Sequence, residues 1–156
     1  MAAVSNSVRS HARFYMSNFI TPEDYTASLH SEILDSLIRA NPATLETLED
    51  RAIAEMESYL RLRYDCAKIF EARSDERHPL ILMRAIDITI YHAFCIHNPQ
   101  KMSNLRLKRY DDAIDWLRKV STGELSIYGA PTLPTETQAA NGFYHMKSNN
   151  KRECRT

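Results

Sequence analysis

Glycine is scarce in this chain of 156 residues, which contains only Gly123, Gly129 and Gly142. Glycine makes up about 7% of an average protein, so a first stretch of 122 residues with none is unusual. Glycine supplies turns with positive φ and lets bare backbone approach a phosphate group. The sequence therefore argues against P-loops, dinucleotide-binding loops and β-sandwiches built on glycine turns.

Cysteines are few, and long apolar runs are missing. Cys66, Cys95 and Cys154 are odd in number and lack CxxC spacing, which indicates free thiols in a reducing compartment. No apolar run of about 18 residues, the length of a membrane span, is present. The N-terminus also lacks the apolar segment of a signal peptide. We therefore expect neither secretion nor a membrane partner.

The net charge is zero, because 20 basic residues balance 20 acidic ones. The balance is uneven along the chain. Residues 1–20 carry +2, residues 21–60 carry −7, residues 61–122 carry +4 and residues 123–156 carry +1. In a subunit that meets its own copies, an acidic face of this kind can pair with a basic one.

Length and composition are those of one globular domain. A domain has about 150 residues, and 44% hydrophobic with 26% charged residues is enough apolar material for a core. We expect an N-terminal leader arm over residues 1–20, a helical core over 21–123 and an extended C-terminal tail over 124–156. The tail contains two of the three glycines and two prolines, a composition typical of extended chain.

The first half of the core shows two helical patterns. Thr21-Pro22-Glu23-Asp24 combines an N-cap, a proline at the first helical position and acids in the first turn. One helix, or two short ones, should therefore cover residues 22–40. Residues 43–64 give the clearest amphipathic helix, and residues 71–78 should form a loop. The acids that fall largely off the apolar stripe of this long second helix are Glu46, Glu49, Asp50 and Glu57.

Unlike the amphipathic helix before them, residues 80–97 would form a helix that is apolar on almost every side. Such a pattern indicates a buried central helix. Their polar residues Arg84, Asp87 and Tyr91 share one narrow stripe. A buried charge needs a partner, so we expect Arg84 to pair with Asp87 or with an acid elsewhere. A small helical enzyme that uses this stripe is the least favoured alternative.

The last helix should run over residues 103–121 and stop at Gly123. Its inner stripe consists of Tyr110, Ala113, Ile114, Leu117 and Val120. With these patterns the fold class is all-α, a compact bundle of four to five helices with a long second helix, a buried central helix and an extended C-terminal tail.

The outer side of that last helix is strongly charged. It carries the acids Asp111, Asp112 and Asp115 and the bases Arg106, Lys108 and Arg109. Their spacing predicts a solvated face with ion pairs along the helix, in preference to a carboxylate site. Contact between the basic group and nucleic-acid phosphates stays open, although no aromatic interleaving supports sequence recognition.

Metal binding and nucleophilic catalysis find little support. His92, Cys95 and His97 are ligand types, but on a helix His97 points about 140° away from His92, so three ligands do not converge. Cys66 follows a charged helix end and Cys95 lies in the most apolar segment. A buried free cysteine is usually a small apolar side chain, so we expect no catalytic thiol. We expect no metal, no cofactor and no enzymatic activity.

Four short motifs occur in order along the core. They are Glu23-Asp24-Tyr25, Tyr59-Leu60-x-x-Arg63-Tyr64, Asp87-Ile88-x-x-Tyr91 and Arg109-Tyr110-x-x-Ala113-Ile114-x-x-Leu117. In order and spacing this pattern resembles the small head-tail connector proteins of Mu-like tailed bacteriophages. Those proteins are similar to the all-helical connectors that dock beneath the portal ring. The resemblance covers about residues 19–124.

The resemblance implies a structural role. Connector subunits form a ring, commonly twelvefold, between portal and tail, and double-stranded DNA passes through its lumen. The implied partners are other copies of the chain, the portal protein, tail or tail-adaptor proteins and, without sequence specificity, DNA. The implied location is the head-tail interface of the virion, with host cytoplasm during assembly. The Arg63-Tyr64 and Arg109-Tyr110 pairs should first fix helix ends and only second contact neighbours.

The tail carries two apolar islands that can add to another chain. Ile127, Tyr128, Phe143 and Tyr144 are the candidate tail interface. The alternative function is a cytosolic helical adaptor or regulator that binds a protein partner or DNA.

Overall fold

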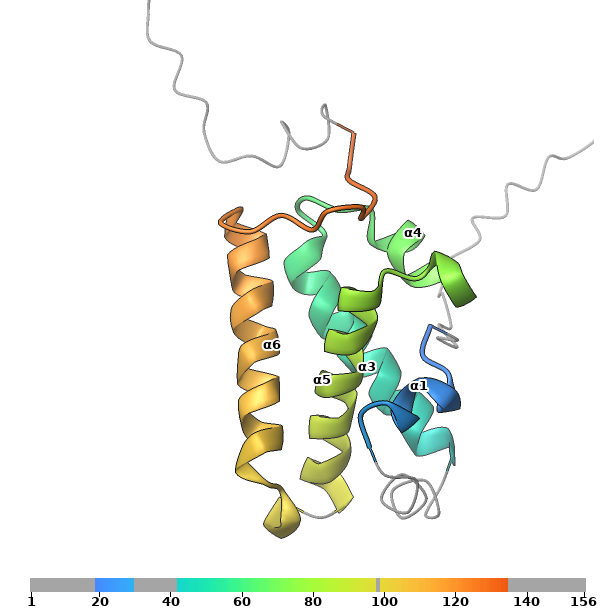
Figure 1. Ribbon diagram of the computed structural model, residues 1–156, viewed down its shortest axis with the longest axis vertical. Coiled ribbons are helices and arrows are strands. Elements are labelled where there is room, and N and C mark those ends of the chain that lie inside the picture. The colour runs from blue at the N-terminus through green and yellow to red at the C-terminus, as the bar shows by residue number, and fades with distance from the viewer. Residues whose placement is uncertain (1–18, 30–41, 98, 135–156) are drawn as a thin grey trace, which may run out of the picture.

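The computed structural model describes residues 19–29, 42–97 and 99–134 (Figure 1). Its α-helices are α1 (Pro22–Thr26), α3 (Pro42–Leu60), α4 (Cys66–Glu71), α5 (Pro79–His97) and α6 (Asn104–Thr122), with 3₁₀ turns at Ser74–Glu76 and Pro99–Lys101. Within these ranges the only strand-like pairing is an isolated bridge between Tyr64 and Thr132. The protein is an all-α bundle, as the sequence predicts.

Three long helices build the core. α5 packs against both α3 and α6, and α3 also packs against α6; in Figure 1 α3 crosses behind α5. The Ile81, Ala85 and Ile88 side chains of α5 are fully buried, which confirms the predicted central helix. α5 is not buried on every side, however, because Met83 and Ile96 are 42% and 53% exposed. By length and composition α5 is also apolar enough to cross a membrane, a test that core helices of soluble proteins pass as well.

The first helix starts where predicted but is short. Thr21 precedes α1, and its backbone N–H donates to Asp24 Oδ2 at 2.7 Å, which satisfies a donor at the helix start. α1 ends at Thr26. One continuous helix to residue 40 is therefore wrong, because residues 27–29 are not helical. The alternative of a second short helix falls on residues 30–40, which lie outside the described part of the chain.

The long second helix ends four residues earlier than predicted. α3 stops at Leu60, and the chain turns so that Tyr64 bridges to Thr132. α4 then follows, although the sequence did not predict it. Asp65 caps α4 by accepting a hydrogen bond of 3.3 Å from the N–H of Lys68. The missed signal was this aspartate, a favoured N-cap residue, at the end of an apolar pattern.

α6 has both predicted ends. Ser103 is its N-cap, and Gly123 ends it with a φ of 83°. This left-handed conformation is one that residues with a Cβ rarely adopt. Residues 124–134 then cross the end of the bundle toward α4 (Figure 1). Two backbone hydrogen bonds hold them there, from Asp65 to Pro131 at 2.9 Å and from Leu133 to Arg63 at 3.0 Å.

Candidate functional site

Arg63 and Tyr64 lie in the loop after α3 and hold the far end of α6. The Arg63 guanidinium donates to the carbonyl oxygens of Ser121 and Thr122, each at 3.3 Å. Carbonyls in the last turn of a helix have no partner inside it. The Tyr64 hydroxyl accepts a hydrogen bond of 2.7 Å from the N–H of Ile127. The two side chains therefore fix the end of α6 and the segment beyond it, while the main-chain N–H groups of both residues donate to the carbonyl oxygen of Leu60 at the end of α3.

Asp87 is buried on α5, and its carboxylate forms an ion pair with Arg109 of α6. Arg109 Nη1 lies 3.6 Å from Asp87 Oδ1. Burial raises the pKa of Asp87, while the positive charges of Arg109, Arg84 and Arg106 act against that rise. The expected ion pair between Arg84 and Asp87 does not form. The facing helix supplies the partner instead, and the Arg84 guanidinium lies 6.0 Å from the ring centroid of Trp116.

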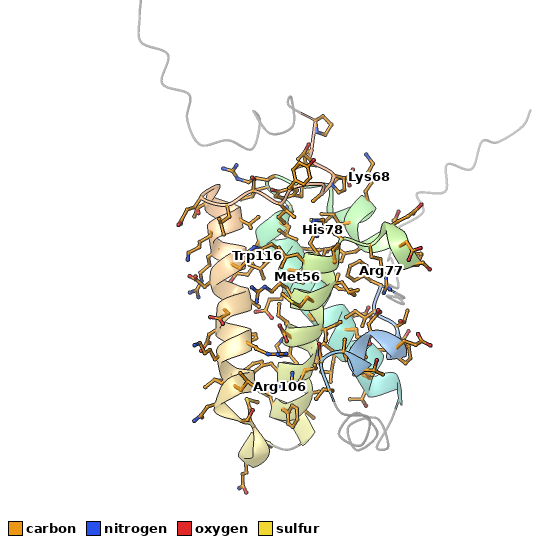
Figure 2. The ribbon with its side chains drawn as sticks, in the orientation of Figure 1. Met56, Lys68, Arg77, His78, Arg106 and Trp116 are labelled. Atoms are coloured by element: carbon orange, nitrogen blue, oxygen red, sulfur yellow. The ribbon has the colours of Figure 1, made fainter. Side chains whose placement is uncertain are left out.

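Arg84, Arg106 and Arg109 thus form an arginine cluster around one carboxylate. Arg106 crosses from α6 and donates through Nη2 to the backbone oxygen of Ser28, after α1. Figure 2 shows Arg106 and Trp116 at two levels of the α5–α6 seam. Arg84 Nε and Arg106 Nη1 are buried and have no acceptor among the residues that the structure describes. The sequence indicated the polar stripe of α5 but not the approach of Arg106.

A second polar cluster joins the three long helices around Glu55 of α3. Its Oε2 lies 3.0 Å from His92 Nε2 of α5, and its Oε1 accepts a hydrogen bond of 3.1 Å from the Tyr110 hydroxyl of α6. The Tyr110 ring stacks on that of Tyr91 with centroids 3.8 Å apart. Burial and the charge of Glu55 raise the pKa of Tyr110 to about 12. The phenol therefore stays neutral and fastens one helix to the next.

A third polar group holds α1 to the bundle. The buried Tyr25 hydroxyl donates to Glu49 Oε1 at 2.6 Å, and Arg77 binds both carboxylate oxygens of Asp24, at 2.5 and 3.1 Å. Burial raises the pKa of Glu49 to about 7. Burial also acts on Asp24, but the hydrogen bond from Arg77 lowers the pKa of that carboxyl. The prediction that Glu49 lies off the apolar stripe is wrong, because it points into the core toward Tyr25.

Three further motif residues are packing residues. Leu60 and Leu117 are fully buried, and Tyr59 is half-buried against the same core. Their apolar surface stabilises the bundle by removing it from water. The role of these three motif residues is therefore to stabilise the fold.

The tail candidates divide into three cases. Ile127 is buried on its own chain, because its N–H is bound by Tyr64 and its side chain joins the core. Tyr128 is 97% exposed. Phe143 and Tyr144 lie outside the described residues. Of the two described candidates, only Tyr128 has an exposed side chain, and its contact with a partner stays a prediction.

An open groove of about 610 Å³ lies between α4, the start of α5 and residues 129–131. Figure 2 labels its basic residues Lys68, Arg77 and His78. Lys68 pairs with Asp65 at 3.1 Å, and Arg77 is bound to Asp24. Both cations are thus engaged within the chain.

Two free cysteines lie in the described ranges, Cys66, which is half-buried, and Cys95, which is exposed although it lies in the apolar helix α5. Burial raises the pKa of the Cys66 thiol to about 11, so the reactive thiolate is a small fraction at neutral pH. Within residues 19–29, 42–97 and 99–134, no three His, Cys, Asp or Glu side chains are grouped to hold a metal ion. The absence of enzymatic activity stays a prediction.

Comparison with known proteins identifies the family of this chain. A family model described as bacteriophage Mu, Gp36 matches residues 19–146. No curated protein and no solved structure matches the chain. The family match includes the whole described bundle and confirms the predicted relationship to Mu-like phage proteins. The chain belongs to the bacteriophage Mu Gp36 family of phage proteins.

Proposed function

We propose that this protein is a non-enzymatic structural component of a tailed-phage virion. In this role it forms a homo-oligomeric ring, the head-tail connector, between the portal protein and the tail, and double-stranded DNA passes through the lumen. The observation that carries the proposal is the family match over residues 19–146. Within the phage proteins, the order of the four connector-like motifs supports the more specific role of a connector.

The structure supports a rigid subunit. Glu55 ties α3, α5 and α6 together, while Arg63 and Tyr64 tie the end of α6 to the loop after α3. Both Arg-Tyr motif pairs are engaged inside the subunit. Rigid subunits with two different complementary faces close into rings by head-to-tail contacts. The acidic and basic halves of the sequence provide two such faces.

The test is a null allele of the gene in the phage that encodes it. We expect DNA-filled heads and separate tails that do not join, with infectivity restored by the gene supplied in trans. Electron microscopy of the purified chain should show closed rings, and the rings should bind the portal protein. Virions should contain the protein at the neck.

Two outcomes would overturn the proposal. Normal virions without the protein would exclude a connector. A chain that stays monomeric at all concentrations, with and without portal protein, would exclude the ring. Binding to duplex DNA with a steep salt dependence, in the absence of any particle association, would favour a cytosolic regulator.

A further inference from the structure

The open groove between α4, the start of α5 and residues 129–131 has apolar walls. Ala72, Pro79, Gly129 and Pro131 line it, and none of the four is fully buried. Gly129 borders open space, because a Cβ added to it would meet no atom within 4 Å apart from its chain neighbours. The volume of about 610 Å³ lies in the range of about 300–1,000 Å³ that is typical of pockets for small organic ligands. The groove therefore has room for an aromatic side chain of another segment.

The basic residues at the rim of this groove already have partners within the chain. Lys68 and Arg77 each form an ion pair with an aspartate, and His78 Nε2 lies 2.9 Å from the carbonyl oxygen of Tyr128. A charged ligand would have to displace these contacts. Burial of apolar surface is therefore the main attraction that the groove offers, and it favours an apolar or aromatic ligand.

The family match extends past the described bundle at one end only. It begins at Phe19, the first described residue, and ends at Met146, whereas the last described residue is Pro134. The family model thus covers residues 135–146, but it does not cover residues 1–18. The covered extension ends in Phe143-Tyr144-His145-Met146, which supplies two aromatic side chains. This extension is therefore the segment whose chemistry fits the groove.

We propose that Phe143 and Tyr144 of one copy of this chain dock in the groove of the neighbouring copy. The inference rests on the proposed ring and names one contact within it. Aromatic side chains are typical anchors of such contacts, because each buries a large apolar area and fills a pocket. Each copy then provides one tail and receives another, which is a heterologous contact of the kind that closes a ring.

The position of Pro134 favours the groove of a neighbour. Pro134 follows Pro131, which lines the groove, by three residues, so the tail starts at the rim. In Figure 1 the last described residues rise away from the bundle that carries their own groove. Residues 135–142 span at most about 29 Å when extended. That reach is about the length of a 19-residue helix such as α6, so it is enough to cross to an adjoining subunit.

The experiment places a photoreactive side chain in the tail. Phe143→p-benzoylphenylalanine keeps an aromatic ring at the docking position. Under ultraviolet light its ketone carbon bonds to the carbon of a C–H group in contact, and the ketone oxygen takes up the hydrogen, so no further reagent is consumed. Asn150→p-benzoylphenylalanine, in the tail but outside the family match, is the matched control. Each variant is assembled from ¹⁵N-labelled and unlabelled copies, and mass spectrometry distinguishes links between copies from links within one.

We expect links between copies from position 143 to Ala72, Pro79 or Pro131, at least about tenfold more frequent than such links from position 150. Links within one copy only, or links only to added portal protein, overturn the docking proposal. Rings that form without any link from position 143 to the groove overturn it too, while leaving the ring intact. If neither the variants nor the wild-type protein assembles, the ring and the docking are both refuted.

Removal of the two aromatic rings gives a second measurement. Phe143→Ser combined with Tyr144→Ser should raise the concentration at which half of the chain is assembled by about tenfold. Asn149→Ser combined with Asn150→Ser should leave that concentration unchanged. Far-UV circular dichroism establishes that each variant is folded, and unchanged assembly of the folded variant without the rings refutes the proposal.

Filling the groove tests its role from the other side of the contact. Ala72→Trp should occupy the groove and raise the same concentration by about tenfold, whereas Ala54→Trp, on the exposed side of α3, should leave it unchanged. Links from position 143 to the groove should also disappear in Ala72→Trp. Equal assembly of the two folded Trp variants would show that the groove is not part of the contact.

Discussion

Glu49 accepts a hydrogen bond of 2.6 Å from Tyr25, and the two side chains bury a carboxyl group and a phenol between α1 and α3. The carboxyl group has acidic neighbours, and burial is the main reason that its pKa rises to about 7. The charges of Glu46, Asp50 and Asp24 add to the rise, and the hydrogen bond from Tyr25 acts against it. The packing of α1 on α3 therefore depends on whether the Glu49 carboxyl is protonated.

Stability should fall as the pH rises from about 5.5 to about 8. The folded state keeps a proton on Glu49 up to about pH 7, whereas the unfolded chain releases it near the ordinary glutamate pKa of 4.5. The contribution is fully present below the unfolded value and is lost as the pH rises through the folded one. We expect about 2 kcal/mol between pH 5.5 and 8, measured by urea unfolding.

Glu49→Gln is the matched variant for that measurement. Its amide has almost the same shape and does not titrate, so the difference in unfolding free energy between the two proteins isolates this group. The variant should be the more stable protein at pH 8 and lose most of the slope. An equal slope in both proteins would assign the pH dependence to other groups.

Gly123→Ala and Arg63→Ala should be energetically coupled. A Cβ at residue 123 would collide with the Arg63 guanidinium, and the φ of 83° is itself strained for alanine. We expect Gly123→Ala to cost about 1–2 kcal/mol in the free energy of unfolding. Removing Arg63 relieves the collision but loses two bonds to α6 carbonyls. In a double-mutant cycle the combined cost should therefore be about 0.5 kcal/mol or more below the sum.

Tyr64→Phe should release residues 124–134 from the bundle. The variant leaves the N–H of Ile127 buried without its acceptor, which costs about 1–3 kcal/mol. The side chains of Leu125 and Tyr128 are already exposed, and release of the backbone lets this segment enter the active site of chymotrypsin, so cleavage should quicken. Tyr59→Phe, for which no hydrogen bond of the hydroxyl is recorded in the described residues, is the control and should be cleaved at the wild-type rate.

Asp87→Asn should destabilise the fold, because it removes the one negative charge inside the arginine cluster. We expect a loss of about 1–2 kcal/mol, below that of a fully buried pair because Arg109 is partly exposed. Asp111→Asn, on the exposed side of α6, should leave stability unchanged. Thermal unfolding followed by circular dichroism makes the comparison, and equal midpoints for both variants would contradict the assigned role of Asp87.

The elements that the sequence predicts well have both a periodic pattern and a marked end. α5 begins at Pro79 against a predicted start at residue 80, and α6 ends at the predicted Gly123, because proline and glycine restrict or permit backbone angles locally. α4 has six residues, too few for a periodic pattern. The early end of α3 depends on contacts with Pro131, Thr132 and Leu133, which sequence spacing does not reveal.

For the polar sites too, sequence spacing predicts the residues on one helix but not their partners on another. The stripe of Arg84, Asp87 and Tyr91 was visible from helical spacing, yet its partners come from α6, and their identity depends on how two helices face each other. Glu49 did leave a signal, since it lies four residues after Leu45 and three before Ala52 on the inner side of α3. An acid at such a position indicates a buried polar partner.

The attachment of residues 124–134 also sets how the molecule bears load. The bridge between Tyr64 and Thr132 is antiparallel, and the backbone bonds of Arg63 and Asp65 flank it. A pull on the chain beyond Pro134 is therefore delivered first to the loop after α3, where these two backbone hydrogen bonds resist it together. The end of α6 is shielded from that force, so tension on the C-terminal end should leave the helical bundle intact until this short bridge gives way.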